Sequence, residues 1–351
     1  MFTLGIETSC DETAAAVVED ARFVRSSVVA SQDDLHAEYG GVVPELAGRA
    51  HVEKIIPILR KALRDAGLSW QGLDAVAVGH RPGLIGSLLV GVSAAKAIAW
   101  SLGVPLVGVD HVQAHLFAPL LEHERETDEF PALGLVVSGG HTSLYRVEGP
   151  TSLARLGGTI DDAVGEVYDK VATILGLPYP GGPRIDALAR EPGADDRMVD
   201  FPVSRLGRDS LDFSFSGLKT AVLYEVRGKP ASTRPGKPQP DPAPPMTEER
   251  RRGIAASFQR AAIRAVTLKL GRALDANPEC RALLVGGGVS ANSRLRADLA
   301  GLCARRGVSL RLAEPRYCVD NAAMIAGLGA HLLEAGEVAD LSLSPVPTTA
   351  C

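Results

Sequence analysis

The chain has 351 residues, which is too long for one hydrophobic core of ordinary size and predicts two domains. Its composition, with 46% hydrophobic and 23% charged residues, is typical of a soluble globular protein. The formal net charge of -5 argues against a surface that binds nucleic acid over its whole extent, and leaves room only for local basic patches.

The N-terminal segment begins as a strand, and residues 1–4 lack the charged region that opens a secretory signal peptide. Residues 4–18, LGIETSCDETAAAVV, contain two apolar runs around a turn of small and polar residues, which is typical of a β-hairpin. The five cysteines of the chain are scattered and have no CxxC spacing, which argues against a disulfide framework or a zinc ribbon. We therefore expect a cytoplasmic protein.

Strand and helix patterns alternate in the next part of the chain. Residues 73–80 (LDAVAVGH) predict a strand, residues 83–102 a helix and residues 105–110 another strand. This is the most apolar part of the sequence, but Lys96 and Pro105 interrupt it. We therefore expect a buried helix followed by a strand, and no membrane span.

Two histidines four residues apart follow directly, in the stretch DHVQAHLFAPL. Asp110 is placed to cap a helix that carries His111 and His115 on one face. Such a pair suits half of a metal site, although a structural pair fits the spacing equally well. Val112 stands where the HExxH motif of metalloproteases has its glutamate, so the general base of such an enzyme is missing.

The start of the chain is repeated after a charged linker. Residues 133–147, LGLVVSGGHTSLYRV, match residues 4–18 at five positions and predict a second hairpin. We therefore expect a duplicated α/β protein with a boundary near residues 125–132. The N-terminal domain would comprise residues 1–130 and the C-terminal domain residues 131–351.

Two glycine turns have the character of anion or nucleotide sites. In VVSGGHTS, the hydroxyl of Ser138 and the amides of Gly139 and Gly140 could form a nest for an anion. In VGGGVSAN, three glycines between a strand and a helix allow a ring or phosphate to approach the main chain, with Asn292 in the next turn. Neither turn matches GxGxxG or the P-loop, which disfavours a Rossmann fold and a P-loop ATPase.

A carboxylate-rich segment, residues 157–189, lies between these turns. Glu166 and Lys170 could form a plain ion pair on an exposed helix face. The constrained YPGGP turn and the carboxylates around it, Asp169 and Asp186, favour instead a site that accepts hydrogen bonds from ribose hydroxyls or an amine.

The rest of the chain contains a proline-rich segment, residues 227–250, which predicts a loop or insertion. Its basic residues could contact a phosphate backbone or could be solvated. A strand, glycine turn and helix are expected over residues 281–307, a strand over 309–315 and a helix over 321–336. Asp320 precedes this last helix, and is either its cap or a third metal ligand beside the two histidines, a set that suits zinc or iron(II).

Several motifs in a fixed order carry a resemblance to a known family. They are IETSCDET, the histidine pair, VSGGHT, IDDAVGEVYDKVA with YPGGP, FSFSGLKTA, GGGVSAN and CVDNAAM. With them the chain resembles the bacterial type of the tRNA N6-adenosine threonylcarbamoyltransferase family, formerly the O-sialoglycoprotein endopeptidase family. The resemblance implies a duplicated α/β fold like that of actin, Hsp70 and sugar kinases. In such a fold two domains face a nucleotide cleft. The last helix of the chain could then pack back on the N-terminal domain.

The resemblance also implies a reaction: transfer of the threonylcarbamoyl group from threonylcarbamoyl-AMP to N6 of adenosine 37, in tRNAs that read codons beginning with A. It implies one divalent metal, iron(II) in preference to zinc(II), held by His111, His115 and Asp320. Asp11 and Glu12 become candidates for orienting or deprotonating the adenosine amine. The residues that match the family's nucleotide-substrate contacts are Val136, Val137, Ser138, Gly139, Gly140, Asp169, Gly182, Asp186 and Asn292.

Partners are implied in the same way: tRNA, a smaller paralogue of the same fold that docks on the N-terminal domain, and a P-loop ATPase, without a membrane. The sequence departs from the family pattern in three places. HVQAH replaces HVEGH, Arg81 replaces a glycine in the turn HRPGL, and Val136 stands where some relatives have a tyrosine ligand. An ATP-dependent small-molecule kinase and a nucleotide-gated, non-catalytic scaffold for tRNA and partners remain as alternatives.

Overall fold

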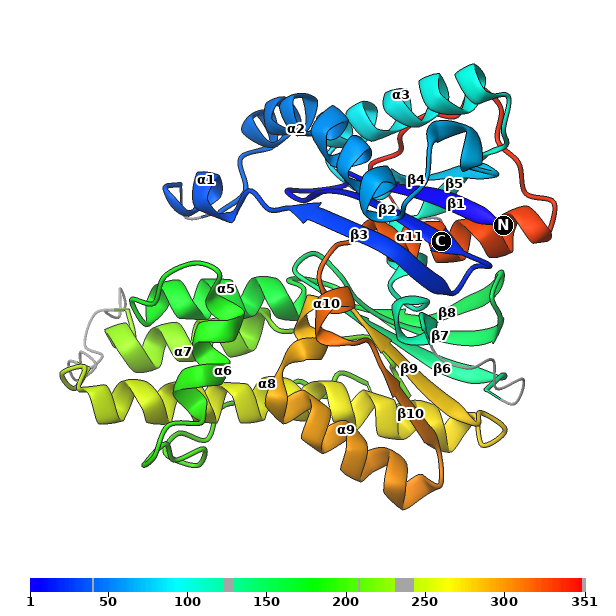
Figure 1. Cartoon of the computed structure of the whole chain (residues 1–351). Coiled ribbons are helices and arrows are strands. Elements are labelled where there is room, and N and C mark those ends of the chain that lie inside the picture. Colours follow the sequence, from blue (N-terminus) through cyan, green and yellow to red (C-terminus); the bar gives the residue numbers. More distant parts are fainter. Residues whose placement is uncertain (40, 123–128, 208, 231–242, 349–351) are drawn as a thin grey trace.

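The computed structural model describes the chain except for residues 40, 123–128, 208, 231–242 and 349–351. It contains two five-stranded mixed sheets with the same strand order, β3-β2-β1-β4-β5 and β8-β7-β6-β9-β10, stacked one above the other in Figure 1. The N-terminal sheet consists of β1 (Phe2–Glu7), β2 (Thr13–Glu19), β3 (Phe23–Ala30), β4 (Ala75–Arg81) and β5 (Leu106–Asp110). The C-terminal sheet consists of β6 (Ala132–Val137), β7 (Thr142–Gly149), β8 (Ser152–Gly158), β9 (Ala282–Gly286) and β10 (Ser309–Leu312).

The register of the strands confirms the predicted duplication. Leu4 lies opposite Val17 in the first hairpin, and Leu133 lies opposite Arg146 in the second, so both partners are displaced by the same number of residues. The first strand of each hairpin then pairs in parallel with a strand that arrives much later in the chain, β1 with β4 and β6 with β9. Two copies of one α/β unit therefore build the protein.

The N-terminal sheet is covered on both faces. Helices α2 (Pro44–Asp65) and α3 (Ile85–Leu102) pack on one face and bury an aliphatic cluster around Leu4, Ile6 and Val78. The predicted helix over residues 83–102 is thus α3, the one described helix whose length and apolar character would also suit a membrane span. It packs against β4 through its buried side chains. A short helix, α1 (Asp33–Ala37), precedes α2.

The other face of this sheet receives α11 (Ala322–Glu334), which comes from the far end of the sequence. The helix lies so close to β1 that a Cβ atom on Gly5 would be 2.1 Å from the carbonyl oxygen of Ala322. Glycine at this position therefore permits the contact. Asp320, directly before α11, is brought to the N-terminal sheet by the same packing.

Long helices cover the C-terminal sheet, with α8 packed against both α6 and α9. The helices of this part are α5 (Val164–Ile174), α6 (Gly181–Ala189), α7 (Ser216–Arg227), α8 (Glu248–Ala276), α9 (Ser293–Arg306) and α10 (Pro315–Cys318). Single 3₁₀ turns lie at η1 (Trp70–Gly72), η2 (Ala118–Leu120) and η3 (Gly288–Ala291).

Two boundaries expected from the sequence shift. The strand expected over residues 309–315 ends at Leu312, because Pro315 begins α10. Thr247 caps α8, so the end of the proline-rich segment 227–250 is helical. Its middle, with Arg234 and Lys237, lies outside the described residues, as does the first half of the predicted boundary near 125–132.

The short helix α4 (His111–Ala114) connects the two sheets. Val112 and Leu116 lie in a buried cluster with Ala132, Val136 and other residues of the C-terminal sheet. At the end of β9, a Cβ atom on Gly286 would be 1.9 Å from the carbonyl oxygen of His115. The segment with the two histidines therefore packs directly against the C-terminal end of β9 in the second sheet.

Candidate metal centre

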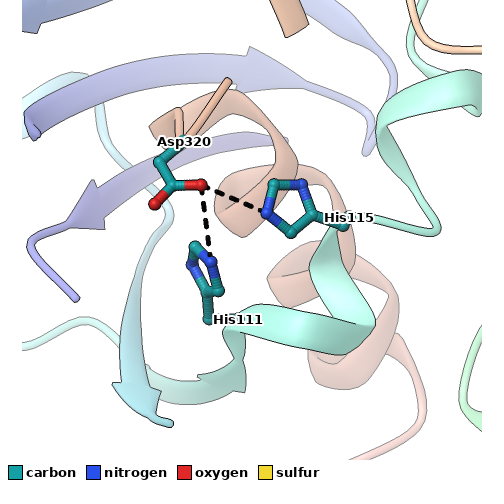
Figure 2. A group of neighbouring side chains, drawn as sticks. All are labelled: His111, His115 and Asp320. Atoms are coloured by element: carbon teal, nitrogen blue, oxygen red, sulfur yellow. Dashed lines mark ion pairs between the residues drawn. The ribbon is translucent and has the colours of Figure 1, made fainter. Parts of the chain in front are cut away.

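The two histidines converge on one carboxylate. Nε2 of His111 and Nε2 of His115 lie 3.5 Å and 3.2 Å from Oδ1 of Asp320, as Figure 2 shows. Asp110 fixes the histidine helix, because its side chain accepts hydrogen bonds from the amides of Val112 and Gln113. The predicted cap is confirmed, and it aims both imidazoles at the loop before α11.

Asp320 does not cap α11. Asn321 does so, because its side-chain oxygen accepts a hydrogen bond from the amide of Met324 at 3.0 Å. The capping alternative for Asp320 is therefore wrong, and its carboxylate is left facing the two imidazoles. Of the two interpretations that the sequence left open, the ligand-like placement is the one observed.

The three donors fit a divalent cation. Ligand atoms bound about 2.1 Å from a tetrahedral ion are separated by about 3.4 Å, close to the observed spacing. Both ring nitrogens of His115 are buried, and neither forms a hydrogen bond of acceptable geometry with any described residue, despite the approach of Asp320. A buried imidazole without a partner is costly, and a shared cation would satisfy it.

Charge interactions at the centre are strong. Burial alone would lower the pKa of His111, but the carboxylates of Asp320 and Glu7 outweigh it and raise that pKa to about 9. Burial lowers the pKa of His115. For Asp320, burial acts upwards, but the two imidazoles hold its pKa well below the ordinary value. This site therefore strongly favours positive charge beside Asp320.

The first hairpin turn borders this centre. Asp11 and Glu12 have carboxylate oxygens within 4.8 Å of that of Asp33, so the turn carries a cluster of acidic groups. Burial, together with the charges of Asp320 and Asp11, raises the pKa of Glu12 to about 10. The turn predicted to carry Asp11 and Glu12 thus lies within electrostatic reach of Asp320.

The two glycine turns lie side by side. A Cβ atom on Gly287, whose φ is +93°, would be 2.4 Å from the carbonyl oxygen of Val137. Gly139 and Gly140 are exposed, and an added Cβ on either would meet no described atom within 4 Å. The nest around Ser138 is therefore open to a ligand.

The side chains of Val136 and Val137 are fully buried, which leaves only their backbone for contact with a ligand.

The remaining candidate residues form two groups, Asp169 with Gly182 and Asp186 with Asn292. Asp169 accepts a hydrogen bond from the amide of Gly181 at 2.7 Å, and so holds the start of α6, where Gly182 has free space around it.

Asp186 and Asn292, far apart in the sequence, meet through one side chain that the sequence did not indicate. Nε2 of Gln259 donates to Asp186, and its Oε1 accepts from Asn292 at 2.8 Å. Asp186 also accepts from the hydroxyl of Ser293 at 2.7 Å.

The charged face of α5 has the simpler explanation. Lys170 pairs with Glu166 at 2.7 Å and with Asp162 at 2.9 Å, and Lys219 also bonds to Asp162. Asp161 accepts hydrogen bonds from Ser214, Phe215 and Ser216, which ties the IDDAVGE motif to the start of α7. These residues of the motif therefore have structural partners.

Two residues near the metal centre were missed by sequence reasoning. Glu7 lies 3.1 Å from Nδ1 of His111 and is buried. His141 is close enough for the imidazoles of His111 and His115 to assist burial in lowering its pKa to about 4. Glu7 could have been noticed in the sequence as a single carboxylate at the end of an apolar strand. His141 stood out only as part of the VSGGHT turn.

Arg81, one of the three departures from the family pattern, lies close to the helix that carries the histidines. Its Nε lies 3.3 Å from Oδ2 of Asp110, the residue that caps the histidine helix. The substitution therefore adds an ion pair beside the metal centre and leaves the three ligand candidates unchanged.

Comparison with known proteins identifies the family of the chain. Residues 23–327 match the model of a family described as TsaD, tRNA N6-adenosine threonylcarbamoyltransferase. A protein of that name from Pelobacter propionicus is 49% identical over 99% of this chain and 97% of its own length. Another, from Sorangium cellulosum, is 47% identical over 100% of this chain and 97% of its own length.

Solved structures support the fold alone. HypF from T. kodakarensis aligns with 95% of this chain and 48% of its own, with a TM-score of 0.60 and 16% identity. Component A of (R)-2-hydroxyglutaryl-CoA dehydratase from Acidaminococcus fermentans aligns with 94% of this chain and 97% of its own, with a TM-score of 0.51 and 12% identity. These neighbours have the actin, Hsp70 and sugar-kinase architecture expected from the sequence.

Proposed function

The chain belongs to the tRNA N6-adenosine threonylcarbamoyltransferase family, and from that premise we propose how its residues divide the work of the reaction. The protein is a transferase that modifies tRNA. We propose that the donor is threonylcarbamoyl-AMP and that the acceptor is N6 of adenosine 37 in tRNAs that read codons beginning with A. The observation that carries this proposal is the convergence of two imidazoles and a carboxylate beside two adjacent glycine turns, of which the one at Gly139 and Gly140 is open.

The bonds to be changed set the requirements. The adenosine amine attacks the carbonyl carbon of the threonylcarbamoyl group, forming a C–N bond. The bond from that carbon to the phosphate oxygen breaks, and AMP leaves with the electron pair. The amine must also lose one proton. The protein therefore has to hold a phosphate, orient a carbonyl group and accept a proton.

We assign the carbonyl to the centre formed by His111, His115 and Asp320. These residues would hold one divalent cation. Two histidines and a carboxylate with open positions suit zinc(II) or iron(II), and we propose iron(II) because the family resemblance implies it. The cation, when bound, would act as a Lewis acid on the carbonyl oxygen. The absence of a glutamate at Val112 fits this use, because water is not the nucleophile.

Phosphate and nucleoside recognition fall to the glycine turns. Gly139 and Gly140 are exposed residues beside Ser138, and we assign the phosphate of the donor to this turn, whose amides could form an anion nest. We assign recognition of ribose or base to Asp186 and Asn292, which Gln259 joins, together with Asp169 and Gly182 of α5 and α6. We assign the amine proton to the turn that carries Asp11 and Glu12. Because burial and neighbouring carboxylates raise the pKa of Glu12 to about 10, Glu12 holds a proton at neutral pH and would orient the substrate as a hydrogen-bond donor, which leaves Asp11 to accept the proton.

Partner binding is assigned to the outer surface of α2 and α3. Val52, Ile56, Ile85 and Leu89 are apolar and exposed there, with Val52 63% accessible. A groove of about 420 Å³ lies between the helices, lined by Pro44, Glu45, Gly48, Arg49, Val52, Gly86 and Val90. We propose that the smaller paralogue docks on this surface and that a P-loop ATPase joins the complex. Action on tRNA would place the complex in the cytoplasm.

Nucleoside mass spectrometry tests the proposed function. The metal-loaded protein and its two partners are incubated with threonylcarbamoyl-AMP, ATP and tRNA that has an unmodified adenosine 37. Threonylcarbamoyladenosine should form with the wild type and fall to background with His111→Ala. If the wild type forms none while a control enzyme modifies the same tRNA, the proposal fails. The kinase and scaffold alternatives are not favoured, because the curated relatives are named for the transfer reaction.

A further inference from the structure

We propose that Glu7 is a positioning residue of the metal centre: its buried carboxylate holds the proton of His111 on Nδ1, so that Nε2 offers its lone pair to the cation. This inference rests on the proposed metal site and adds a residue that directs one of the ligands. It predicts that the two histidines are not equivalent.

The contacts of Glu7 show how the imidazole is held. Oε2 lies 3.1 Å from Nδ1 of His111, while the opposite ring nitrogen, Nε2, faces Asp320. A carboxylate only accepts hydrogen bonds, so Nδ1 must be the donor. Metal-ligating histidines usually donate their second nitrogen in this way, which fixes both tautomer and ring orientation.

Ser9 is the competing partner of the same nitrogen. Its hydroxyl oxygen lies 3.2 Å from Nδ1 of His111. A hydroxyl both donates and accepts, so Ser9 alone would permit either tautomer. The carboxylate of Glu7 would be repelled by a lone pair on Nδ1, and Glu7 therefore decides which nitrogen carries the proton.

The surrounding backbone holds Glu7 in place. Its Oε1 accepts a hydrogen bond from the amide of Ser9 at 2.5 Å, and the side chain is inaccessible to solvent. On the neighbouring strand β4, a Cβ atom on Gly79 would be 2.5 Å from Oε2. Glycine at position 79 thus leaves the space that the carboxylate occupies, so the contact with His111 is set by two adjacent strands.

His115 provides the contrast within the same centre. Apart from the carboxylate of Asp320, 3.2 Å from Nε2, neither of its ring nitrogens has a hydrogen-bond partner in the described part of the chain. Loss of Glu7 should therefore act through His111 alone. Removal of such an outer partner of a metal ligand typically costs about 10–100-fold in metal affinity.

The test is a metal titration of the full-length protein, using Zn²⁺ in competition with a chromogenic chelator and Co²⁺ for its visible spectrum. For Glu7→Gln we expect a Kd about 10–100-fold higher than that of the wild type and an altered Co²⁺ spectrum. Glu7→Asp, which keeps the charge, should recover part of the loss. Glu166→Gln, which removes an exposed carboxylate, is the matched control and should bind Zn²⁺ like the wild type.

A double-mutant cycle separates this role from general packing. In a His111→Ala background, Glu7→Gln should change the residual Zn²⁺ affinity by less than about twofold, whereas additive losses would contradict the proposal. Equal affinities of Glu7→Gln and the wild type would also overturn it. Should Glu7→Gln fail to fold, long-range ¹H–¹⁵N spectra of the Zn²⁺-loaded wild type decide the matter. A proton on Nδ1 and zinc on Nε2 of His111 are expected, and zinc on Nδ1 would refute the proposal.

Failure here can be told from failure of the proposed function. The titration requires neither tRNA nor partner proteins. Unchanged metal affinity in Glu7→Gln would remove the positioning role and leave the transferase assignment intact. A wild type that binds Zn²⁺ tightly yet forms no modified nucleoside would overturn the reaction assignment alone.

Discussion

Nε2 of His115 lies 3.2 Å from Oδ1 of Asp320, although the two residues are far apart in the sequence. The packing of α11 on the N-terminal sheet produces this approach, because Asp320 immediately precedes that helix. The candidate metal centre therefore forms because the end of the chain returns to the N-terminal sheet. Its metal affinity should depend both on the segment that carries the two histidines and on the segment that carries Asp320.

Metal binding should stabilise the wild type and not a variant that lacks the carboxylate. A ligand present at 100 times its Kd adds about 2.7 kcal/mol to the free energy of unfolding. We expect Zn²⁺ to raise the melting temperature of the wild type, and a chelator to reverse the rise. Asp320→Asn should show neither effect. Differential scanning fluorimetry measures this, and equal stabilisation of both proteins would argue against Asp320 as a ligand.

The cap of the histidine helix should matter more than its ion pair. Asp110→Ala removes an acceptor for two backbone amides and should cost about 1–2 kcal/mol of stability together with metal affinity. Arg81→Ala leaves the cap intact and breaks a half-exposed pair, which is worth at most about 1 kcal/mol. Urea unfolding and Zn²⁺ titration of the two variants compare them. If Arg81→Ala lowered stability or Zn²⁺ affinity more than Asp110→Ala, the ion pair with Arg81, and not the helix cap, would hold this segment in place.

Two glycine substitutions should separate folding from ligand binding. Gly286→Ala places a Cβ against the carbonyl of His115 and should destabilise the protein by about 1–3 kcal/mol. Gly140→Ala meets no described atom and should melt like the wild type. If the nest around Ser138 binds the donor phosphate, Gly140→Ala should nevertheless weaken nucleotide binding in isothermal titration calorimetry. Unchanged affinity would place the phosphate elsewhere.

The stability contributed by Asp161 should depend on pH. Burial alone would raise its pKa, but hydrogen bonds from Ser214, Phe215 and Ser216 hold it below the ordinary value of 3.8. A lowered folded-state pKa means that the ionised carboxylate stabilises the fold above pH 3.8, and that this stabilisation is lost as the pH falls through the folded-state value.

Asp161→Asn should therefore lose about 1 kcal/mol at pH 7 and progressively less as the pH is lowered below 3.8, as determined by urea unfolding over this range. A difference that is independent of pH would show that the lost stability comes from shape and not from charge.

Charge placed on the α2–α3 surface should abolish partner binding without unfolding the protein. Val52 and Ile56 are exposed, so Val52→Asp and Ile56→Asp lose no core packing. We expect normal melting and normal Zn²⁺ affinity, with more than tenfold weaker binding to the paralogue by surface plasmon resonance. Tyr224→Asp, at an exposed position on α7, is the control. Unchanged binding in both α2 variants would move the interface away from this surface.

Much of the fold follows from local patterns. Alternating apolar runs and helix patterns predicted the strands β4, β5 and β9 and the helices α3, α9 and α11, because hydrophobic periodicity reflects which face of an element is buried. The internal repeat predicted the two hairpins, which have the same register. A helix cap is equally local, and Asp110 was identified correctly for that reason.

The centre itself required the tertiary structure. Spacing brought His111 and His115 together, but it could not decide whether Asp320 caps α11 or faces the two histidines. Glu7 and Gln259 became visible only through their partners, which lie on other strands and helices. Local chemistry thus determined the elements and the donor types. Sheet topology and the close packing of α11 decided which donors meet, because contacts between distant segments depend on the path of the whole chain.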